Sequence, residues 1–423
     1  MLVTFSKFGQ KFGSNAGITS LMDDLGEALS GESDMIMMGG GNPAHIPQIQ
    51  QVFRSRLQEI IRSPVEFESL IGTYDPPQGN IAFIRTLKEL LNAEFGWDLN
   101  VDNIALTNGS QSAFFMLFNL LAGEFEDSSY KQIHLPLTPE YIGYSDSGII
   151  ENFFHSSKPS IEDIDAETFK YHVDFESFQL TENCGALCVS RPTNPTGNVL
   201  TDIEINKLDK LAKQKGVPLI IDAAYGAPFP NLIFSEATPI WNDNIILCLS
   251  LSKFGLPAAR TGIVIAKEET IKALSSMNAI MNLATGSFGS LLAVNMLKSK
   301  EILSLSSQVV KPYYEDKAKR ARDYLLARLK GLPIKLPKVD GAMFLWLWLK
   351  GCPVHNDILY ARLKEKGVLI VSGHHFFPGL SAEDKHNWQH TKQCLRITYS
   401  QNEALVFKGL DIIAAEIHLA YES

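Results

Sequence analysis

The chain lacks any apolar run long enough to cross a membrane. Its longest candidates are residues 113–122, which Asn119 interrupts, and residues 344–349, and both fall far short of the roughly 20 residues that a spanning helix needs. Residues 1–7 also lack a basic region followed by a long apolar stretch, as a secretory signal peptide would have. We therefore expect a cytoplasmic protein without a membrane partner.

Cysteine is scarce, with five residues scattered along a chain of 423. An odd number at irregular spacing favours reduced thiols over a disulfide framework. Cys184 and Cys188 lie four residues apart, but no nearby histidine pair completes a zinc site, and the alternation around them is typical of a strand. We expect these thiols to pack in the core, and we expect no metal.

An excess of positive charge is also absent. The formal net charge is -9, which disfavours nucleic acid as a partner. Hydrophobic residues make up 45% and charged residues 20% of the chain, as in ordinary globular proteins, and we find neither repeats nor low-complexity tracts. The length of 423 residues predicts two domains.

Short apolar runs alternate with segments of helical periodicity. Strands are predicted at residues 132–135, 186–190, 218–222, 244–250 and 262–266, with a helix at residues 202–215. This alternation is typical of an α/β fold, in which a mostly parallel sheet is covered by helices on both faces.

The last hundred residues follow a different pattern. We predict a long helix at about residues 310–330, strands at 342–348, 368–371 and 394–399, and a final helix at about 402–420. We therefore expect a large domain over residues 56–309 and a smaller α+β domain over residues 310–423, which the N-terminal segment 1–55 joins.

Three polar side chains follow the predicted strands. Asn194 lies beyond the strand at 186–190, Asp222 ends the next, and Lys253 follows the strand at 244–250. In open α/β sheets the ligand crevice lies outside the carboxyl ends of the strands, so these residues can converge there.

Lys253 lies in a loop of small and apolar residues and is followed by Arg260. A desolvated pocket containing a second cation keeps an amine partly neutral, and a neutral amine can form a Schiff base with an aldehyde cofactor. Residues 250–253 also fit the S-x-x-K pattern of serine acyl-enzymes, although residues 128–131 fit it equally and no S-D-N or K-T-G companion is present. A surface lysine is the plain alternative.

Asp222 closes an aliphatic run, where an unpaired carboxylate would be costly to bury. A protonated pyridine nitrogen would be a suitable partner, and the carboxylate would keep that ring cationic. Tyr225 and Asn194 could both donate to the ring oxygen of such a cofactor. A capping aspartate, an interface tyrosine and a turn asparagine are the alternatives.

Two further segments suggest anion binding. Residues 108–112 turn from a short strand into a helix, whose exposed backbone N–H groups can hold a phosphate, although Ser110 could simply cap that helix. The alternation of residues 394–398 places Arg396 on the less apolar face of a strand. Its guanidinium could hold a substrate carboxylate through two hydrogen bonds, and a solvent-exposed arginine is the alternative.

Taken together, the motifs resemble those of the class I and II aminotransferases, a fold type I family of pyridoxal-phosphate enzymes, over nearly the whole chain. They are GGGNP at 39–43, LTNGSQSAFF at 106–115, PEYIGY at 139–144, SRPTNPTGN at 190–198, AYGAPFP at 224–230, SLSK at 250–253 with Arg260, and FFPGL at 376–380. The ordered set is specific, although no single motif is.

The resemblance implies that pyridoxal 5′-phosphate is the cofactor and that Lys253 is its Schiff-base lysine. It implies that Asp222 pairs with the pyridine nitrogen, that Asn194 and Tyr225 approach the ring oxygen, and that Tyr141 stacks on the ring. The residues implied to hold the phosphate are Ser110, Gln111, Ser250 and Arg260. Seven residues separate Lys253 from Arg260 here, against eight in aspartate-type enzymes, so the register of Arg260 departs from that pattern.

The resemblance also implies a homodimer, because a tyrosine matching Tyr74 reaches the phosphate in the neighbouring subunit. Arg396, with Asn194 and the backbone near Gly41, would hold the substrate carboxylate.

The reaction implied by the resemblance is a ping-pong exchange between a small neutral amino acid and a 2-oxo acid. L-alanine plus 3-methyl-2-oxobutanoate giving pyruvate plus L-valine fits best. Lys253 would move the proton at the substrate α-carbon as general base and acid. Transamination of other neutral or aromatic amino acids, β-elimination, and a non-catalytic sensor remain alternatives, although a sensor should carry a DNA-binding module, for which we see no room before Gly39.

Overall fold

The structure is a computed structural model that describes residues 4–13, 26 and 35–423. Its strands are β1 Ile36–Met37, β2 Ile104–Asn108, β3 Gly123–Glu124, β4 Tyr130–Leu135, β5 Phe154–Ser156, β6 Ser160–Asp163, β7 Thr168–His172, β8 Cys184–Ser190, β9 Leu219–Asp222, β10 Ile245–Ser250, β11 Thr261–Ile265, β12 Ile334–Pro337, β13 Phe344–Leu349, β14 Val368–Leu369, β15 Val371–Ser372 and β16 Cys394–Thr398.

The helices alternate with these strands. They are α1 Lys7–Phe12, α3 Pro47–Arg62, α4 Pro64–Gly72, α5 Ile81–Phe95, α6 Ser110–Leu121, α7 Asp202–Lys215, α8 Glu268–Asn282, α9 Phe288–Lys298, α10 Glu301–Leu305, α11 Lys311–Arg328, α12 Asn356–Glu365, α13 Ala382–Asn387 and α14 Glu403–Tyr421. Within the described residues, no helix is both long enough and apolar enough to cross a membrane.

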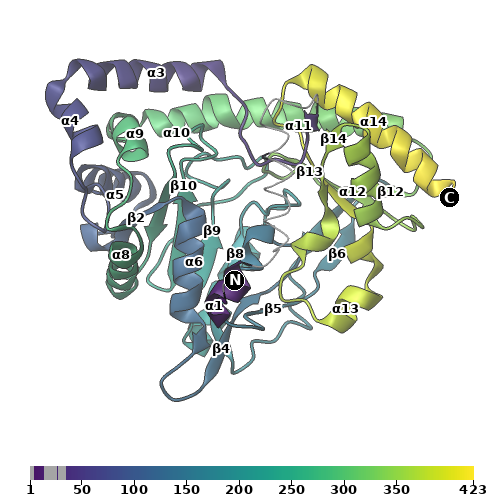
Figure 1. The fold of residues 1–423 in the computed structure, drawn as a ribbon, viewed down its shortest axis with the longest axis horizontal. Coiled ribbons are helices and arrows are strands. Elements are labelled where there is room, and N and C mark those ends of the chain that lie inside the picture. The colour runs from purple at the N-terminus through teal and green to yellow at the C-terminus, as the bar shows by residue number, and fades with distance from the viewer. Residues whose placement is uncertain (1–3, 14–25, 27–34) are drawn as a thin grey trace.

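A large sheet forms the centre of the molecule (Figure 1). Its eight strands run in the order β2-β11-β10-β9-β8-β4-β3, with β5 beside β4. The strands β10, β9, β8, β4 and β5 are parallel, and β11 is antiparallel to both β10 and β2. The predicted α/β fold with a mostly parallel sheet is confirmed.

Both faces of this sheet are buried. Along β10, Leu247 and Leu249 contribute to one core and Ile246 and Cys248 to a second, because successive side chains of a strand point to opposite faces. Helices α5 and α7 supply residues to the first core, and α6 and α8 to the second. This double burial explains why the predicted strands are continuous apolar runs.

A second sheet of six strands has the order β15-β16-β13-β12-β7-β6 and lies beside helices α12, α13 and α14 (Figure 1). Strands β6 and β7 come from the middle of the chain, and β7 pairs in parallel with β12. Strand β1, near the N-terminus, pairs with β14. The smaller α+β unit therefore takes strands from three parts of the sequence, which the predicted segments 1–55 and 310–423 do not fully include.

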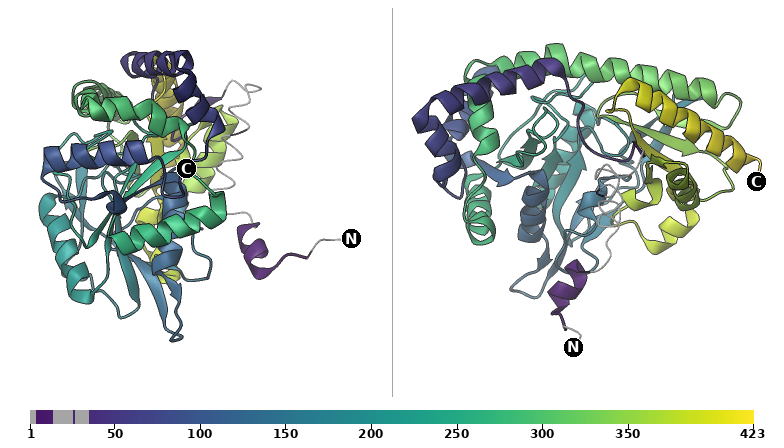
Figure 2. Two further views of the ribbon diagram at one scale, coloured as in Figure 1. Left: turned by 90° about the vertical axis from the view of Figure 1, so that its left-hand side faces the viewer. Right: turned by 45° about the horizontal axis from the view of Figure 1, so that its top comes forward.

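A long helical stretch connects the two units. Helix α10 continues through a π-helical turn, Ser306–Val310, into α11. Figure 2 shows α11 extending along the top of the molecule. This helix corresponds to the long helix predicted at about residues 310–330. In the same figure α1 lies at the outside of the molecule; none of its residues is buried, and Phe12 packs against Phe115.

One predicted helix agrees with the structure, whereas one predicted strand is divided because its two halves pair with different strands. Helix α7 covers the predicted 202–215, held by a capping box between Thr201 and Glu204 and ended by Gly216 in the left-handed conformation. The single strand predicted at 368–371 is wrong. The structure has two short strands there, because β14 pairs with β1 whereas β15 pairs with β16.

Candidate active site

The carboxyl ends of three parallel strands meet at one edge of the large sheet. Ser190 at the end of β8 is in register with Asp222 at the end of β9, which is in register with Cys248 near the end of β10. Asn194 and Lys253 lie in the segments that follow β8 and β10. The strand-end argument from the sequence therefore brings these side chains to one place.

A cavity of about 330 Å³ lies at this edge of the sheet. All predicted site residues except Tyr74 line it, namely Gly41, Ser110, Gln111, Tyr141, Asn194, Asp222, Tyr225, Ser250, Lys253, Arg260 and Arg396. Tyr74 lies just beyond α4 and is 81% exposed. Within one chain it does not contribute to the cavity.

Lys253 is enclosed by the protein, and its Nζ donates to the carbonyl of Gly41 at 2.7 Å. Burial, together with the nearby guanidinium groups of Arg396 and Arg260, lowers the pKa of the amine to about 8, and the charge of Asp222 opposes this shift. A substantial fraction of the amine is therefore neutral near physiological pH, as a nucleophile and general base requires.

Asp222 is buried at the end of β9 and accepts two hydrogen bonds. The Tyr144 hydroxyl donates to Oδ2 at 2.7 Å, and the backbone N–H of Ala224 donates to Oδ1 at 2.9 Å. Burial raises the pKa of the carboxyl, while both hydrogen bonds and the charge of Lys253 oppose the rise. A cationic ring nitrogen beside this carboxylate would stabilise its ionised form and so offset the effect of desolvation on the pKa of Asp222.

The N-terminus of α6 and Arg260 form a second part of the cavity. Gly109 precedes the helix with φ of 85°, and a Cβ there would lie 2.2 Å from Nη2 of Arg260. A Cβ on Gly262 would lie 2.6 Å from the backbone nitrogen of Ser110. The two glycines therefore allow the guanidinium and the helix N-terminus to approach each other, and both groups attract phosphate.

Two polar residues beside this turn are fixed by hydrogen bonds within the protein. Ser250 Oγ accepts from the backbone N–H of Ser252 at 3.1 Å. Gln111 Nε2 donates to the carbonyl of Gly143 at 2.9 Å. Both side chains are thus oriented while they line the cavity.

Arg396 lies at the other side of the cavity on β16 and is only 3% exposed, so the solvent-exposed alternative is wrong. Its Nη1 donates to Asn194 Oδ1 at 2.8 Å, and its Nη2 donates to the carbonyl of Gly39. The guanidinium carbon lies 4.4 Å from the ring centre of Phe344 and 5.1 Å from that of Phe376. Burial lowers its pKa to about 10, and its Nε has no hydrogen-bond partner.

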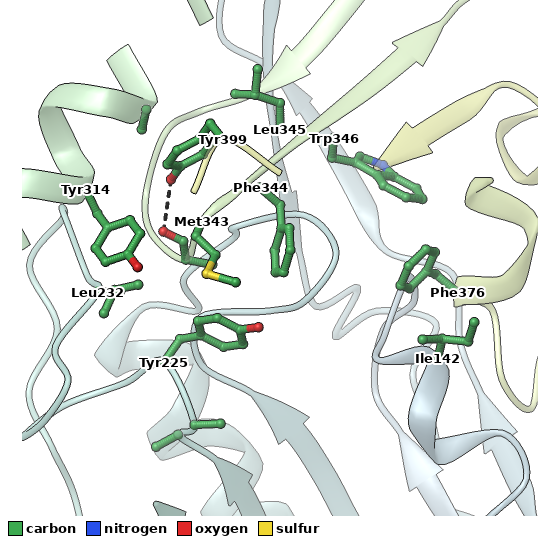
Figure 3. Packing of buried hydrophobic residues seen from close by; sticks show 14 of the residues in the cluster. Ile142, Tyr225, Leu232, Tyr314, Met343, Phe344, Leu345, Trp346, Phe376 and Tyr399 are labelled. Carbon is green, nitrogen blue, oxygen red and sulfur yellow. Dashed lines mark hydrogen bonds between the residues drawn. The ribbon is translucent and has the colours of Figure 1, made fainter. Parts of the chain in front are cut away.

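Aromatic rings enclose the space between these groups. Tyr225 packs against Phe344 with ring centres 5.8 Å apart, where the loop after β9 meets the start of β13 (Figure 3). The ring centre of Tyr225 lies 5.3 Å from Lys253 Nζ. Tyr141 packs edge-on against Tyr144 at 5.4 Å and also lines the cavity.

Some residues around the site had no assigned role in the sequence. Tyr144 bonds Asp222, and Ser190 and Glu140 bond each other behind it. Tyr144 and Glu140 lie within the PEYIGY motif, and Ser190 is the polar end of an apolar strand. A polar residue at the end of an apolar strand could have indicated that Ser190 belongs to the site. The sequence does not predict which of these side chains form hydrogen bonds with one another.

The cavity fits pyridoxal phosphate. A partly neutral buried amine, a buried carboxylate, and a helix N-terminus beside an arginine match the aldehyde, pyridine nitrogen and phosphate of that molecule. Among the described residues, Nε of Arg396 has no hydrogen-bond partner, so the guanidinium has a free donor in addition to those that the protein binds. Within the described ranges, no cluster of three or more His, Cys, Asp or Glu residues could hold a metal ion.

Known proteins are similar to this chain over nearly its full length. The family model described as aminotransferase class I and II matches residues 33–413. The chain is 49% identical to the valine–pyruvate aminotransferase of Escherichia coli strain K12 over 419 residues, which cover 99% of each protein.

Solved structures agree with that result. A protein from Psychrobacter arcticum 273-4 superimposes with a TM-score of 0.96 at 43% identity, covering 100% of both chains. The valine–pyruvate aminotransferase of Salmonella typhimurium LT2 has a TM-score of 0.88 at 47% identity, covering 96% of this chain and 100% of the other. The chain therefore belongs to the class I and II aminotransferases, which use pyridoxal phosphate as their cofactor.

Proposed function

We propose that the protein is a valine–pyruvate aminotransferase, which converts L-alanine and 3-methyl-2-oxobutanoate into pyruvate and L-valine. The choice of a neutral substrate rests on the number of cationic side chains with which this chain lines the cavity. Among the described residues, its cationic side chains are Lys253, Arg260 and Arg396. One serves the cofactor aldehyde and one the phosphate, which leaves a single guanidinium for a single substrate carboxylate. The full-length similarity to two valine–pyruvate aminotransferases supports the same choice.

Arg396 holds the substrate carboxylate in this proposal. Asn194 and the Gly39 carbonyl fix two of its nitrogens, and Phe344 and Phe376 flank the guanidinium. A planar group held in this way can offer paired hydrogen bonds to a carboxylate with little loss of side-chain entropy. Substrate orientation therefore depends on β16 and its neighbours.

Lys253 would act as general base on the proton of the substrate α-carbon and as general acid toward the aldehyde carbon of the cofactor. Pyridoxal phosphate supplies the aldehyde that accepts the amino group and a ring that withdraws electrons from the α-carbon. The low pKa of Lys253 suits this role, because the amine must be neutral before it accepts a proton. The Gly41 carbonyl accepts a hydrogen bond from this amine and fixes it at the cavity.

Asp222 holds the ring nitrogen in its protonated form, and Tyr144 keeps the carboxylate oriented. Tyr225 and Asn194 would bind the ring oxygen of the cofactor, and Tyr141 would cover its ring face. Ser110, Gln111, Ser250 and Arg260 hold the phosphate at the start of α6. These roles rest on the family motifs and on the position of each side chain around the cavity.

We further propose a homodimer in which Tyr74 reaches the phosphate of the partner. The surface around it is strongly apolar, with Ile71 64%, Ile280 87% and Leu283 61% exposed. Asp75 Oδ2 accepts from Ser287 Oγ at 2.8 Å, which ties the Tyr74 segment to the region after α8. Exposed apolar side chains gathered on one face favour association with a second subunit. Sedimentation equilibrium should give twice the chain mass.

The smaller domain is proposed to begin at residue 310 and to include residues 1–55, together with strands β6 and β7, which pair with its sheet. The rest of residues 56–309 forms the large domain. The π-helical turn Ser306–Val310 supports the first limit, since such turns often mark hinges. The pairing of β1 with β14 supports the second. The five cysteines are unbridged, which accords with a cytoplasmic location.

A panel of amino donors tests the proposed substrate. The purified protein with pyridoxal phosphate should transfer the amino group of L-valine to pyruvate faster than that of L-aspartate or L-phenylalanine, measured by alanine formation. A marked preference for aspartate or an aromatic donor would overturn the substrate assignment. Turnover that continues without an oxo acid would instead indicate β-elimination.

A further inference from the structure

A second buried carboxyl lies behind the cavity. Glu140 is fully buried in the segment before η2 (Ile142–Tyr144). Its Oε1 accepts from the backbone N–H of Ser190 at 2.8 Å, and its Oε2 accepts from the backbone N–H of Tyr141 at 3.1 Å and from the Ser190 hydroxyl. Its own N–H donates to the carbonyl of Phe376 at 2.8 Å. The carboxyl is thus fixed on every side, although it does not line the cavity.

A chain of hydroxyl groups connects this carboxyl to Asp222. Ser190 and Asp222 are in register on adjacent strands. The Tyr144 hydroxyl donates to Asp222 at 2.7 Å and lies 3.5 Å from Ser190 Oγ. Glu140, Ser190, Tyr144 and Asp222 therefore form one continuous network.

The Ser190 hydroxyl has one proton and faces two acceptors. When Glu140 is ionised, that proton is donated to Glu140 Oε2, and the Tyr144 oxygen receives nothing from Ser190. When Glu140 is protonated, its own proton is donated to Ser190 Oγ, and the Ser190 hydroxyl turns to Tyr144. The donation from Tyr144 to Asp222 is then strengthened, because hydrogen bonds in a chain polarise one another.

Charge connects the two carboxyls as well. Burial raises the pKa of Glu140 to about 7 against the opposing hydrogen bonds, and the charge of Asp222 contributes to the rise. The titratable groups that face Glu140 are Asp222 on β9, Tyr144 in η2 and Cys188 on β8. The pKa of Glu140 thus lies well above that of an ordinary carboxyl, and the charge of Asp222 is one of the causes.

We propose that Glu140 is a positioning residue that acts through Ser190 and Tyr144 to set the charge on Asp222, and hence the proton affinity of the cofactor that Asp222 holds. The inference rests on the proposed function, in which Asp222 pairs with the cofactor ring. An ionised Glu140 adds negative charge to the network and stabilises the protonated, cationic form of the bound cofactor. A neutral Glu140 weakens that stabilisation.

A pH titration of the visible absorbance of the bound cofactor tests this proposal. Glu140→Gln should shift the midpoint to lower pH by about half a unit, less than the 1 to 3 units of a direct charge contact. Ser190→Ala, which keeps both backbone hydrogen bonds to Glu140, should shift it in the same direction by less. Glu416→Gln is the matched control, because Glu416 is a buried carboxylate on α14 paired with Arg362 and Lys366 instead. It should leave the midpoint unchanged.

The link through Tyr144 is tested by combining variants. If Glu140 acts through that hydroxyl, the shift caused by Glu140→Gln should be much smaller in a Tyr144→Phe background than in the parent. Equal shifts in the two backgrounds would overturn the proposed route. Midpoints for Glu140→Gln and Ser190→Ala that equal the parent value would overturn the role of Glu140. Failure of the proposed function would give a different result from failure of the proposed role of Glu140. In that case the parent protein itself would show no cofactor absorbance that depends on Lys253.

Discussion

The two arginines of the cavity occupy opposite environments. Arg396 is buried on a central strand of the smaller sheet, flanked by two phenylalanine rings and bonded to Asn194 and to the Gly39 carbonyl. Arg260 is exposed, and within the part of the chain that the structure describes its one hydrogen bond is a long contact of 3.3 Å from Nη1 to the carbonyl of Pro257. The guanidinium of Arg396 is thus fixed by contacts within the protein, whereas that of Arg260 is exposed to solvent.

This difference matches the two tasks that we propose. A substrate must be held in one orientation in every catalytic cycle, so a pre-oriented, desolvated guanidinium increases both affinity and rate. A phosphate that stays bound is also held by backbone N–H groups at a helix N-terminus, so no single side chain carries the whole charge. Arg396 should therefore contribute far more than Arg260 to turnover.

Removing the amine between the two arginines should have the largest effect. Lys253→Ala should lower kcat by at least about 10³-fold, within the range of general acid–base catalysis, and should abolish the visible absorbance of the bound cofactor. Lys272→Ala, an exposed lysine on α8, is the control and should behave as the parent. Single-turnover rates and spectra measure both effects. A Lys253→Ala protein with the parent spectrum and rate would exclude the amine from the reaction.

Removing the fixed arginine should have the next largest effect. Arg396→Ala deletes two charge-assisted hydrogen bonds to the substrate, so kcat/KM for amino and oxo acids should fall by about 10²- to 10³-fold. The dissociation constant of pyridoxal phosphate should stay near the parent value. Arg396→Lys should recover only part of the loss, since an amine cannot make the paired contact. An unchanged KM in both variants would show that the carboxylate binds elsewhere.

The charge of both arginines should also appear in the pH dependence of cofactor attachment. Lys253 attacks the aldehyde as a neutral amine, and its pKa is lowered to about 8. The attachment rate in the cofactor-free protein should therefore rise about tenfold per pH unit below 8 and level off above it. Stopped-flow absorbance at several pH values measures this rate. A profile that keeps rising to about pH 10 would show that the lysine has an ordinary pKa.

The smallest effect is expected at the exposed arginine. Arg260→Ala should raise the dissociation constant of pyridoxal phosphate by about tenfold and make it less sensitive to salt. At saturating cofactor, kcat should remain close to that of the parent. Arg85→Ala removes an exposed arginine of α5 and is the matched control. If Arg260→Ala lost as much kcat as Arg396→Ala, the proposed difference between the roles of the two arginines would be wrong.

Much of the fold could be predicted because local pattern and burial agree. The strands of the large sheet are apolar runs covered on both faces, and α7 carries its own start and stop residues. Strands β6 and β7 could not be placed, because they follow the large-sheet strand β5 in sequence, whereas β7 pairs with β12 about 170 residues later and β6 pairs with β7. Which sheet a strand joins is decided by tertiary contacts that a single chain does not encode locally.

The site divides in the same way. Asp222 and Lys253 could be proposed from their positions at strand ends, where the topology of a parallel sheet gathers side chains. Glu140 could not, because an acid in a loop normally faces solvent, and its burial depends on Ser190 and Tyr141 closing around it. The alternation around Arg396 could not show that two phenylalanines from other segments would bury it.

The most direct test of the account is to locate the amine that carries the cofactor. The protein is loaded with pyridoxal phosphate, reduced with borohydride, digested and analysed by mass spectrometry. The account predicts a pyridoxyl group on Lys253, between the fixed and the open arginine, and its loss when L-valine is added before reduction. A label on another lysine, or one that L-valine does not remove, would contradict it.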